Sequence, residues 1–142
     1  MKKTTLLILA LGIGFILKAQ TKEDTIGIKA AVMDYIEGFY QGSEKRMDNA
    51  LHPELSKRIM NPSNGKLQNM SKERLVEMTA NKPDEEPTKG KMKADITIYD
   101  ITNDNATVKC VTDKFGFFDY CHLGKAKGEW KIINVLWGYP KK

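Results

Sequence analysis

The chain of 142 residues lacks the short motifs that identify the commonest catalytic sites. It contains no GxxxxGK[ST], GxGxxG, GxSxG or HExxH segment. The sequence therefore gives no motif evidence for nucleotide-phosphate binding, for hydrolysis by a catalytic triad or for zinc-dependent proteolysis. Histidine is scarce, and His52 and His122 lie far apart with no carboxylate pattern beside them. Metal sites need clustered ligands, so we expect no metal and no cofactor.

Cysteine is also scarce. Cys110 and Cys121 are the only two, and their separation excludes a CxxC redox or zinc motif. An oxidising compartment would allow them to form a disulfide, and two buried thiols are the alternative.

No apolar run is long enough to cross a membrane. The run Leu6–Leu17 has 12 residues, too few to span roughly 30 Å of hydrocarbon as a helix. Two lysines precede it and Ala19 follows, which is the pattern of a secretory signal peptide. We therefore predict a signal peptide over residues 1–19, cleaved after Ala19, and one domain over 20–142 in the periplasm or outside the cell. A buried core helix or a membrane anchor is the alternative.

Positive charge is not concentrated on any segment of the predicted mature chain. The whole chain has 23 basic and 18 acidic residues, a net charge of +5. Residues 1–19 hold three of the lysines and no acid, so the mature chain carries 20 − 18, or +2. The remaining charges alternate in sign along the chain. Nucleic-acid binding needs a clustered basic face, so we expect no nucleic-acid partner, and no membrane partner after cleavage.

Hydrophobic periodicity divides the mature chain into a helical first half and a stranded second half. Apolar residues recur every three or four positions in Lys22–Gln41, which predicts an amphipathic helix. Shorter helices are predicted from Ser43 to about Leu51 and from Ser71 to about Ala80, each with a serine cap. The predicted strands are Ser56–Met60, Lys66–Met70, Met92–Ile101, Ala106–Lys114, Phe117–Lys125 and Glu129–Gly138. This order indicates an α+β fold with helices on one side of a curved antiparallel sheet.

The assumed strand register assigns the residues of the last three strands to the two faces of the sheet. A two-residue turn at Lys127-Gly128 would place Cys121 opposite Asn134, and a turn at Phe115-Gly116 would place Cys110 opposite Cys121. One face is then an apolar floor with a few polar groups, which is typical of a ligand pocket. The residues on that face include Val108, Cys110, Thr112, Asp119, Cys121, Leu123, Trp130, Ile132, Asn134 and Leu136. The opposite face carries Tyr120, His122 and Trp137, which suit an interface with another chain.

Three stretches resemble a known family. They are AAVMDYIEGFYQGSEKRMDNALHPEL at 30–55, SKERLVEMT at 71–79 and FFDYCHLGKAKGEWKIINVLWG at 117–138. They are similar to the bacterial proteins called putative lumazine-binding, of the nuclear transport factor 2-like superfamily. The resemblance implies a cone-shaped, cystatin-like sheet wrapped around the first helix, with a pocket inside and dimers formed through the outer sheet face. Relatives in the superfamily include ketosteroid isomerases, polyketide cyclases, dehydratases and non-catalytic binding domains.

Asp119 is the best catalytic candidate in the sequence. On an apolar floor its carboxyl would lose hydration and its pKa would rise, as an acid or base requires. Alternatively, Asp119 lies near a strand end, where it is hydrated or bonds to the backbone. The candidate ligand-binding residues are Tyr35, Phe39, His52, Thr112, Asp119, Asn134 and Leu136.

These observations leave three functional hypotheses. The first is an exported binding or accessory domain with a pocket for a small apolar or aromatic ligand. The second is an isomerase, cyclase or dehydratase that uses Asp119 as general acid or base. The third is a homodimeric structural or interaction module whose working surface is Tyr120, His122 and Trp137.

Overall fold

The computed structural model describes residues 21–81 and 91–141, which form three helices and a six-stranded sheet. The predicted signal peptide, its cleavage site and most of the loop after the third helix lie outside these residues. The elements are α1 (Lys22–Gln41), α2 (Glu44–Ala50), β1 (Leu51–Met60), β2 (Leu67–Met70), α3 (Lys72–Ala80), β3 (Ala94–Thr102), β4 (Asn105–Thr112), β5 (Phe118–Ala126) and β6 (Glu129–Gly138). Within the described ranges, no helix is both long and apolar enough to span a membrane.

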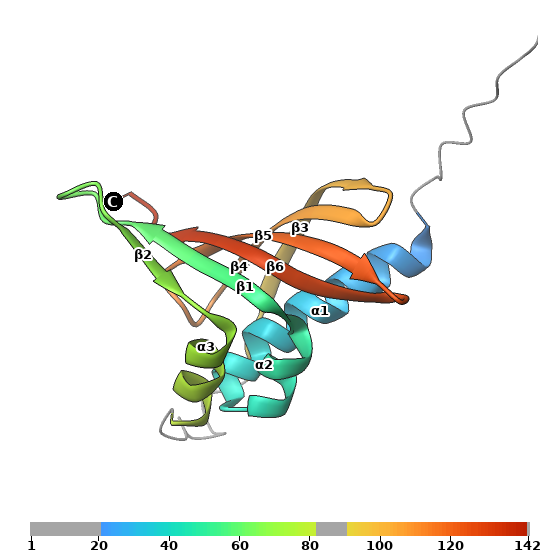
Figure 1. Cartoon of the computed structure of the whole chain (residues 1–142), viewed down its shortest axis with the longest axis horizontal. Helices are drawn as coiled ribbons and strands as arrows, with labels where there is room; N and C mark the ends of the chain where they lie inside the picture. The colour runs from blue at the N-terminus through green and yellow to red at the C-terminus, as the bar shows by residue number, and fades with distance from the viewer. Residues whose placement is uncertain (1–20, 82–90, 142) are drawn as a thin grey trace, which may run out of the picture.

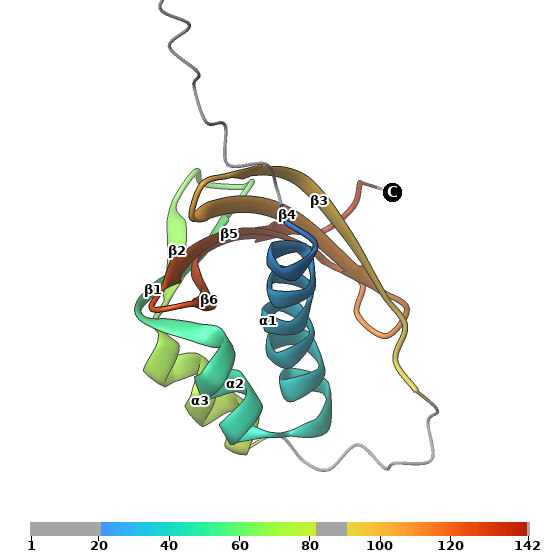
Figure 2. The same ribbon diagram turned by 90° about the vertical axis from the view of Figure 1, so that its right-hand side faces the viewer.

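Helix α1 is the predicted amphipathic helix. The Thr21 side chain accepts a hydrogen bond from the Asp24 amide and caps its start. Gly42 ends it in the left-handed conformation, with φ of 68°, which glycine adopts without steric cost. The apolar stripe is buried, as expected. Figures 1 and 2 show α1 lying under the concave face of the sheet, with α2 and α3 beside it.

The sheet is mixed. Its strand order is β2-β1-β6-β5-β4-β3, and all neighbours are antiparallel except β1 and β6, which are parallel. The prediction of a wholly antiparallel sheet was wrong at this one pairing. Strand β1 also begins at Leu51, earlier than predicted. The β1–β6 register shifts between Leu51 and Ser56, around Pro53, which has no amide hydrogen for a regular ladder.

The predicted β5–β6 register holds only near the turn. Lys127 and Gly128 have φ of 53° and 84°, as a two-residue primed turn requires, and Leu123 pairs with Ile132 as expected. A β-bulge at Ile133 then shifts the pairing by one residue, so Cys121 lies opposite Val135. A shift of one residue exchanges the two faces of a strand.

This exchange corrects three predicted positions. Val135 is fully buried and Trp137 packs against the core on the concave face. Asn134 pairs with His122 and Leu136 is half exposed, both on the convex face. Asn134 and Leu136 therefore do not line the interior, and Trp137 is not on the outer surface.

The β4–β5 register differs from the prediction by two residues. Cys110 lies opposite Asp119, and Cys121 lies opposite Val108, because the connection at 113–117 is longer than a two-residue turn. An even shift leaves each residue on its predicted face. It separates the cysteines, however, and both are buried free thiols with no disulfide between them.

Candidate functional site

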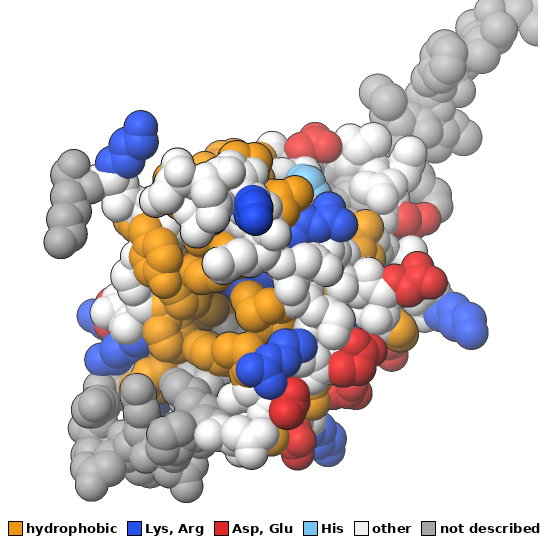
Figure 3. Space-filling view, turned by 60° about the vertical axis from the view of Figure 1, so that its left-hand side comes forward, with side chains coloured by type: hydrophobic (Ala, Val, Ile, Leu, Met, Phe, Trp, Pro, Cys, Tyr) orange, Lys and Arg blue, Asp and Glu red, His pale blue; other side chains and the backbone are white. Residues whose placement is uncertain are grey.

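A small apolar pocket lies between α1, α3 and the concave face of the sheet. Its volume is about 100 Å³. Figure 3 shows a hollow surrounded by hydrophobic side chains on the side of the molecule where β2 and α3 lie. The lining residues are Tyr35, Ile36, Phe39, Lys57, Met70, Leu75, Met78, Phe117 and Trp137. Eight of these nine side chains are apolar or aromatic and one is charged, which is the composition of many ligand pockets.

The charged residue, Lys57, comes from β1 and is almost completely buried, with 5% of its surface exposed. It pairs with Val135 of β6, so it faces the concave side. Its Nζ donates hydrogen bonds to Tyr35 Oη and Asp119 Oδ1, both at 2.6 Å. The Tyr35 hydroxyl donates to Asp119 Oδ2 at 3.2 Å. Residues from α1, β1 and β5 thus form one closed polar triad in the core.

Burial governs the protonation of this triad. It raises the pKa of Asp119, and the charge and hydrogen bond of Lys57 oppose that rise. Burial and the neighbouring Asp119 raise the pKa of Tyr35 well above its usual value, so Tyr35 remains a neutral phenol at physiological pH. The pocket therefore presents the Lys57 ammonium group and the neutral Tyr35 hydroxyl, and Asp119 balances the lysine charge from behind them.

Aromatic rings surround the lysine. Its Nζ lies 5.0 Å from the ring centroid of Trp137 and 5.3 Å from those of Phe117 and Tyr35. These distances are within the range of attractive cation–π contacts. The rings and the triad together hold the ammonium group in one position at the pocket wall.

Asp119 lies behind this wall. It is fully buried, both of its oxygens accept hydrogen bonds from Lys57 and Tyr35, and it is not among the residues that line the pocket. The polar groups that a ligand would meet are therefore Lys57 and Tyr35. The neighbouring thiols are not activated, because burial raises the pKa of Cys110 to about 12 and that of Cys121 well above its usual value.

The predicted ligand-binding residues do not all lie at the pocket. Tyr35 and Phe39 line the pocket. His52 Nδ1 accepts a hydrogen bond from the Glu54 amide at the start of β1. The Thr112 hydroxyl accepts one from the Phe115 amide, within the connection to β5.

The convex face carries the remaining predicted interface residues. Tyr120 stacks on Tyr99, with ring centroids 6.3 Å apart, and His122 Nδ1 lies 3.2 Å from Asn134 Nδ2. Dimer formation through this face stays a prediction.

Sequence reasoning missed Lys57 and most of the pocket wall. One signal was available: Leu55 is a strand residue of core type, and Lys57 follows it at a spacing of two, on the same face of β1. Met70, Leu75 and Met78 come from β2 and α3, and no sequence pattern shows where those elements pack.

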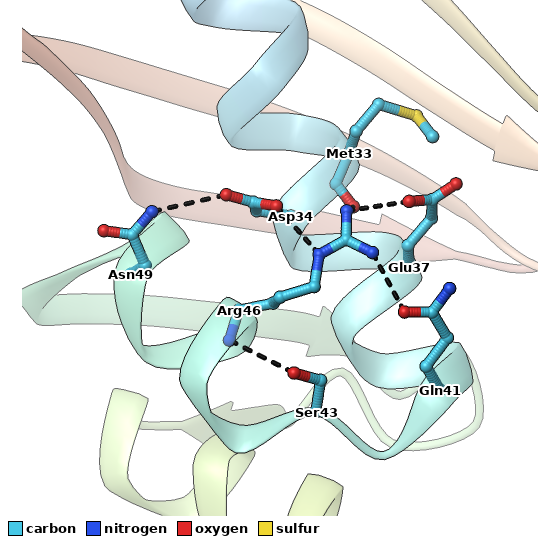
Figure 4. A network of polar contacts seen from close by, with 7 residues as sticks. All are labelled: Met33, Asp34, Glu37, Gln41, Ser43, Arg46 and Asn49. Carbon is cyan, nitrogen blue, oxygen red and sulfur yellow. Dashed lines mark hydrogen bonds and ion pairs between the residues drawn. The ribbon is translucent and has the colours of Figure 1, made fainter.

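A second polar cluster joins the helices away from the pocket (Figure 4). Arg46 of α2 contacts Asp34 Oδ1 at 2.8 Å and Glu37 Oε2 at 2.7 Å, both on α1. It also donates to Gln41 Oε1 at 3.0 Å. Every acceptor of the Arg46 guanidinium lies on α1, and the Arg46 side chain is only partly exposed, so these contacts hold α2 against α1.

Two larger depressions have a different character. One, of about 320 Å³, lies between α1 and the β5–β6 turn, and the other, of about 720 Å³, lies between α2 and α3. Charged side chains form much of both walls, including Glu23, Asp34, Lys125, Glu129 and Lys131 in the first and Glu44, Asp48, Lys72, Glu73 and Glu77 in the second. The small apolar pocket is therefore the best candidate for ligand binding.

Comparison with known proteins identifies the family. The family model described as "Putative lumazine-binding" matches residues 23–138. The chain belongs to this family. No curated protein shows significant similarity to it.

Solved structures of proteins with low sequence identity to this chain share its fold. An NTF2-like protein of unknown function from Shewanella baltica is 21% identical, with a TM-score of 0.72 over 87% of this chain and 99% of the other. One from Silicibacter pomeroyi is 18% identical, with a TM-score of 0.71 over 85% and 99%. A ketosteroid isomerase-like protein from Erwinia carotovora is 16% identical, with a TM-score of 0.58 over 86% and 100%. These likenesses show an NTF2-like fold.

Proposed function

We propose that this member of the putative lumazine-binding family binds a small, largely apolar molecule in the pocket beside Lys57. The observation that carries the proposal is a cavity lined by eight apolar or aromatic side chains and by one charged side chain, Lys57, which two hydrogen bonds hold in place. Apolar walls supply binding free energy, and one fixed polar group sets the orientation of a ligand.

The size of the pocket limits the ligand. A cavity of 150 Å³ holds benzene in a well-studied engineered protein, and this pocket has about 100 Å³. A single ring or a short branched chain is therefore the largest group that can enter, and a bigger molecule would extend out of the mouth. Met70 and Met78 in the wall are flexible side chains that can adjust to such a group.

The geometry favours binding over catalysis by Asp119. A general base must reach the proton that it removes. Asp119 instead directs both carboxylate oxygens to Lys57 and Tyr35, behind the pocket wall. A reaction in this pocket would have to use Lys57 or Tyr35 as the contacting group.

A fragment screen with two matched variants tests the proposal. One-ring fragments are screened by thermal shift against the protein, Met78→Trp and Met60→Trp. Met78 lines the pocket, whereas Met60 is exposed on β1, so both variants add an indole but only the first fills the cavity. A fragment at 100 times its Kd should stabilise the protein by about 2.7 kcal/mol.

We expect that stabilisation to persist in Met60→Trp and to disappear in Met78→Trp. Equal stabilisation of both variants would place the ligand elsewhere and contradict the proposal.

A further inference from the structure

The pocket contains an indole N–H without an acceptor. Trp137 lines the pocket, and its Nε1 is buried. Across residues 21–81 and 91–141, it is the one buried side-chain nitrogen or oxygen that has no hydrogen-bond partner. Buried donors are nearly always paired, because a lost hydrogen bond to water is not otherwise replaced. An unpaired donor on a side chain that lines a pocket therefore suggests where a ligand acceptor could supply the missing hydrogen bond.

Lys57 provides a second donor beside it. An ammonium group has three N–H bonds, and Tyr35 Oη and Asp119 Oδ1 accept two of them. Within the described part of the chain no other residue accepts the third. The Nζ atom is 5.0 Å from the centroid of the Trp137 ring, so the two donors belong to side chains that are in contact at the pocket.

The charge of the site indicates which acceptor is preferred. Lys57 and Asp119 form a buried ion pair with N···O of 2.6 Å, and their charges cancel. A carboxylate ligand would add an uncompensated negative charge to an apolar interior, which is costly. A neutral carbonyl-type oxygen accepts both hydrogen bonds without that cost.

We propose that the pocket selects compact, neutral, apolar molecules with one carbonyl-type oxygen, which accepts hydrogen bonds from Trp137 Nε1 and Lys57 Nζ. This inference rests on the proposed function and specifies its ligand class. It assigns Trp137 and Lys57 as the residues that determine specificity, and Tyr35 and Asp119 as the residues that position Lys57.

Three probes of similar shape test the proposal: cyclohexanone, methylenecyclohexane and cyclohexanecarboxylate. The first two differ only by an oxygen in place of a methylene group. Their Kd values are measured by titration of ¹⁵N-labelled protein, observing the indole N–H signals. The chain has two tryptophans, so these signals are assigned with the variants Trp130→Phe and Trp137→Phe. Trp130 already donates to Asp24 and does not line the pocket.

We expect cyclohexanone to bind at least about tenfold more tightly than methylenecyclohexane, because it satisfies donors that the hydrocarbon leaves unpaired. The Trp137 indole proton should move downfield with cyclohexanone only. The preference for cyclohexanone should fall in Trp137→Phe and persist in Trp130→Phe.

The outcomes separate this inference from the proposed function. Equal affinity for cyclohexanone and methylenecyclohexane would overturn the inference and leave the apolar pocket as a binding site. Binding of cyclohexanecarboxylate as tight as that of cyclohexanone would overturn the preference for a neutral ligand. Failure of all three probes to bind would overturn the proposed function and this inference together.

Discussion

Replacement of Lys57 by methionine should strongly destabilise the fold, because it leaves Asp119 buried without its counter-ion. Methionine keeps most of the length and apolar volume of lysine but removes the ammonium group. Among the described residues, Tyr35 alone would then donate a hydrogen bond to the Asp119 carboxylate. Removal of one partner of a buried ion pair typically costs about 3–5 kcal/mol. Urea denaturation at pH 7, followed by tryptophan fluorescence, measures this loss.

Two further variants isolate the cause. Lys57→Met combined with Asp119→Asn removes both charges, so most of the lost stability should return. Arg74→Met removes a cation on α3 whose side chain is 58% exposed and pairs with a similarly exposed Glu77. It should cost less than about 1 kcal/mol.

The loss in Lys57→Met should also depend on pH. Burial already raises the pKa of Asp119, and Lys57 is the largest influence that lowers it. Without Lys57 this pKa rises further, so the folded state binds a proton more readily than the unfolded state does. The variant should therefore recover stability as the pH falls from 7 towards the unfolded pKa of about 4. A loss below 1 kcal/mol, or one that is independent of pH, would refute the buried ion pair.

Three other predictions concern separate parts of the molecule. Lys125 holds the pKa of Asp24 at about 2, so Asp24→Asn should lower the urea midpoint at pH 7, and the difference from the parent should vanish as the pH falls from about 4 through about 2. Arg46→Met should cost about 1–2 kcal/mol at low salt, and 0.5 M NaCl should reduce the loss; an unchanged loss would show that packing dominates. If the protein dimerises through the convex face, Leu136→Glu should give a monomer in sedimentation velocity, and an intact dimer would exclude that face.

The sequence predicted the elements better than their pairing. The 3.6-residue stripe of α1 and the alternation of β3 to β6 are local signals, and the structure confirms both. The bulge at Ile133 is different, because an extra residue in one strand leaves the apolar alternation on either side looking regular. The exchange of Leu136 and Trp137 between faces follows from that single residue.

The candidate site was harder to predict than the fold. Asp119 was expected on an apolar face, and it lies there. Its partner Lys57 was not identified, since a lysine in a short polar strand is normally exposed. The parallel pairing of β1 with β6 places Lys57 on the concave face, where it contacts Tyr35 of α1. This pairing joins Lys57 to Val135, almost 80 residues apart in the sequence. Lys57 therefore lies between Asp119 and the pocket, and it lines the pocket where Asp119 does not.

Methionine NMR tests most directly the claim that a ligand binds in the apolar pocket beside Lys57. The chain has seven methionines, of which Met70 and Met78 line the pocket, and Met47 and Met92 are buried elsewhere in the core. Protein labelled with ¹³C at the methionine methyl groups is titrated with cyclohexanone. If the apolar pocket beside Lys57 is the binding site, the Met70 and Met78 signals should shift with one common Kd while those of Met47 and Met92 stay in place. Saturable shifts confined to other methionines, or no shifts at all, would contradict the account.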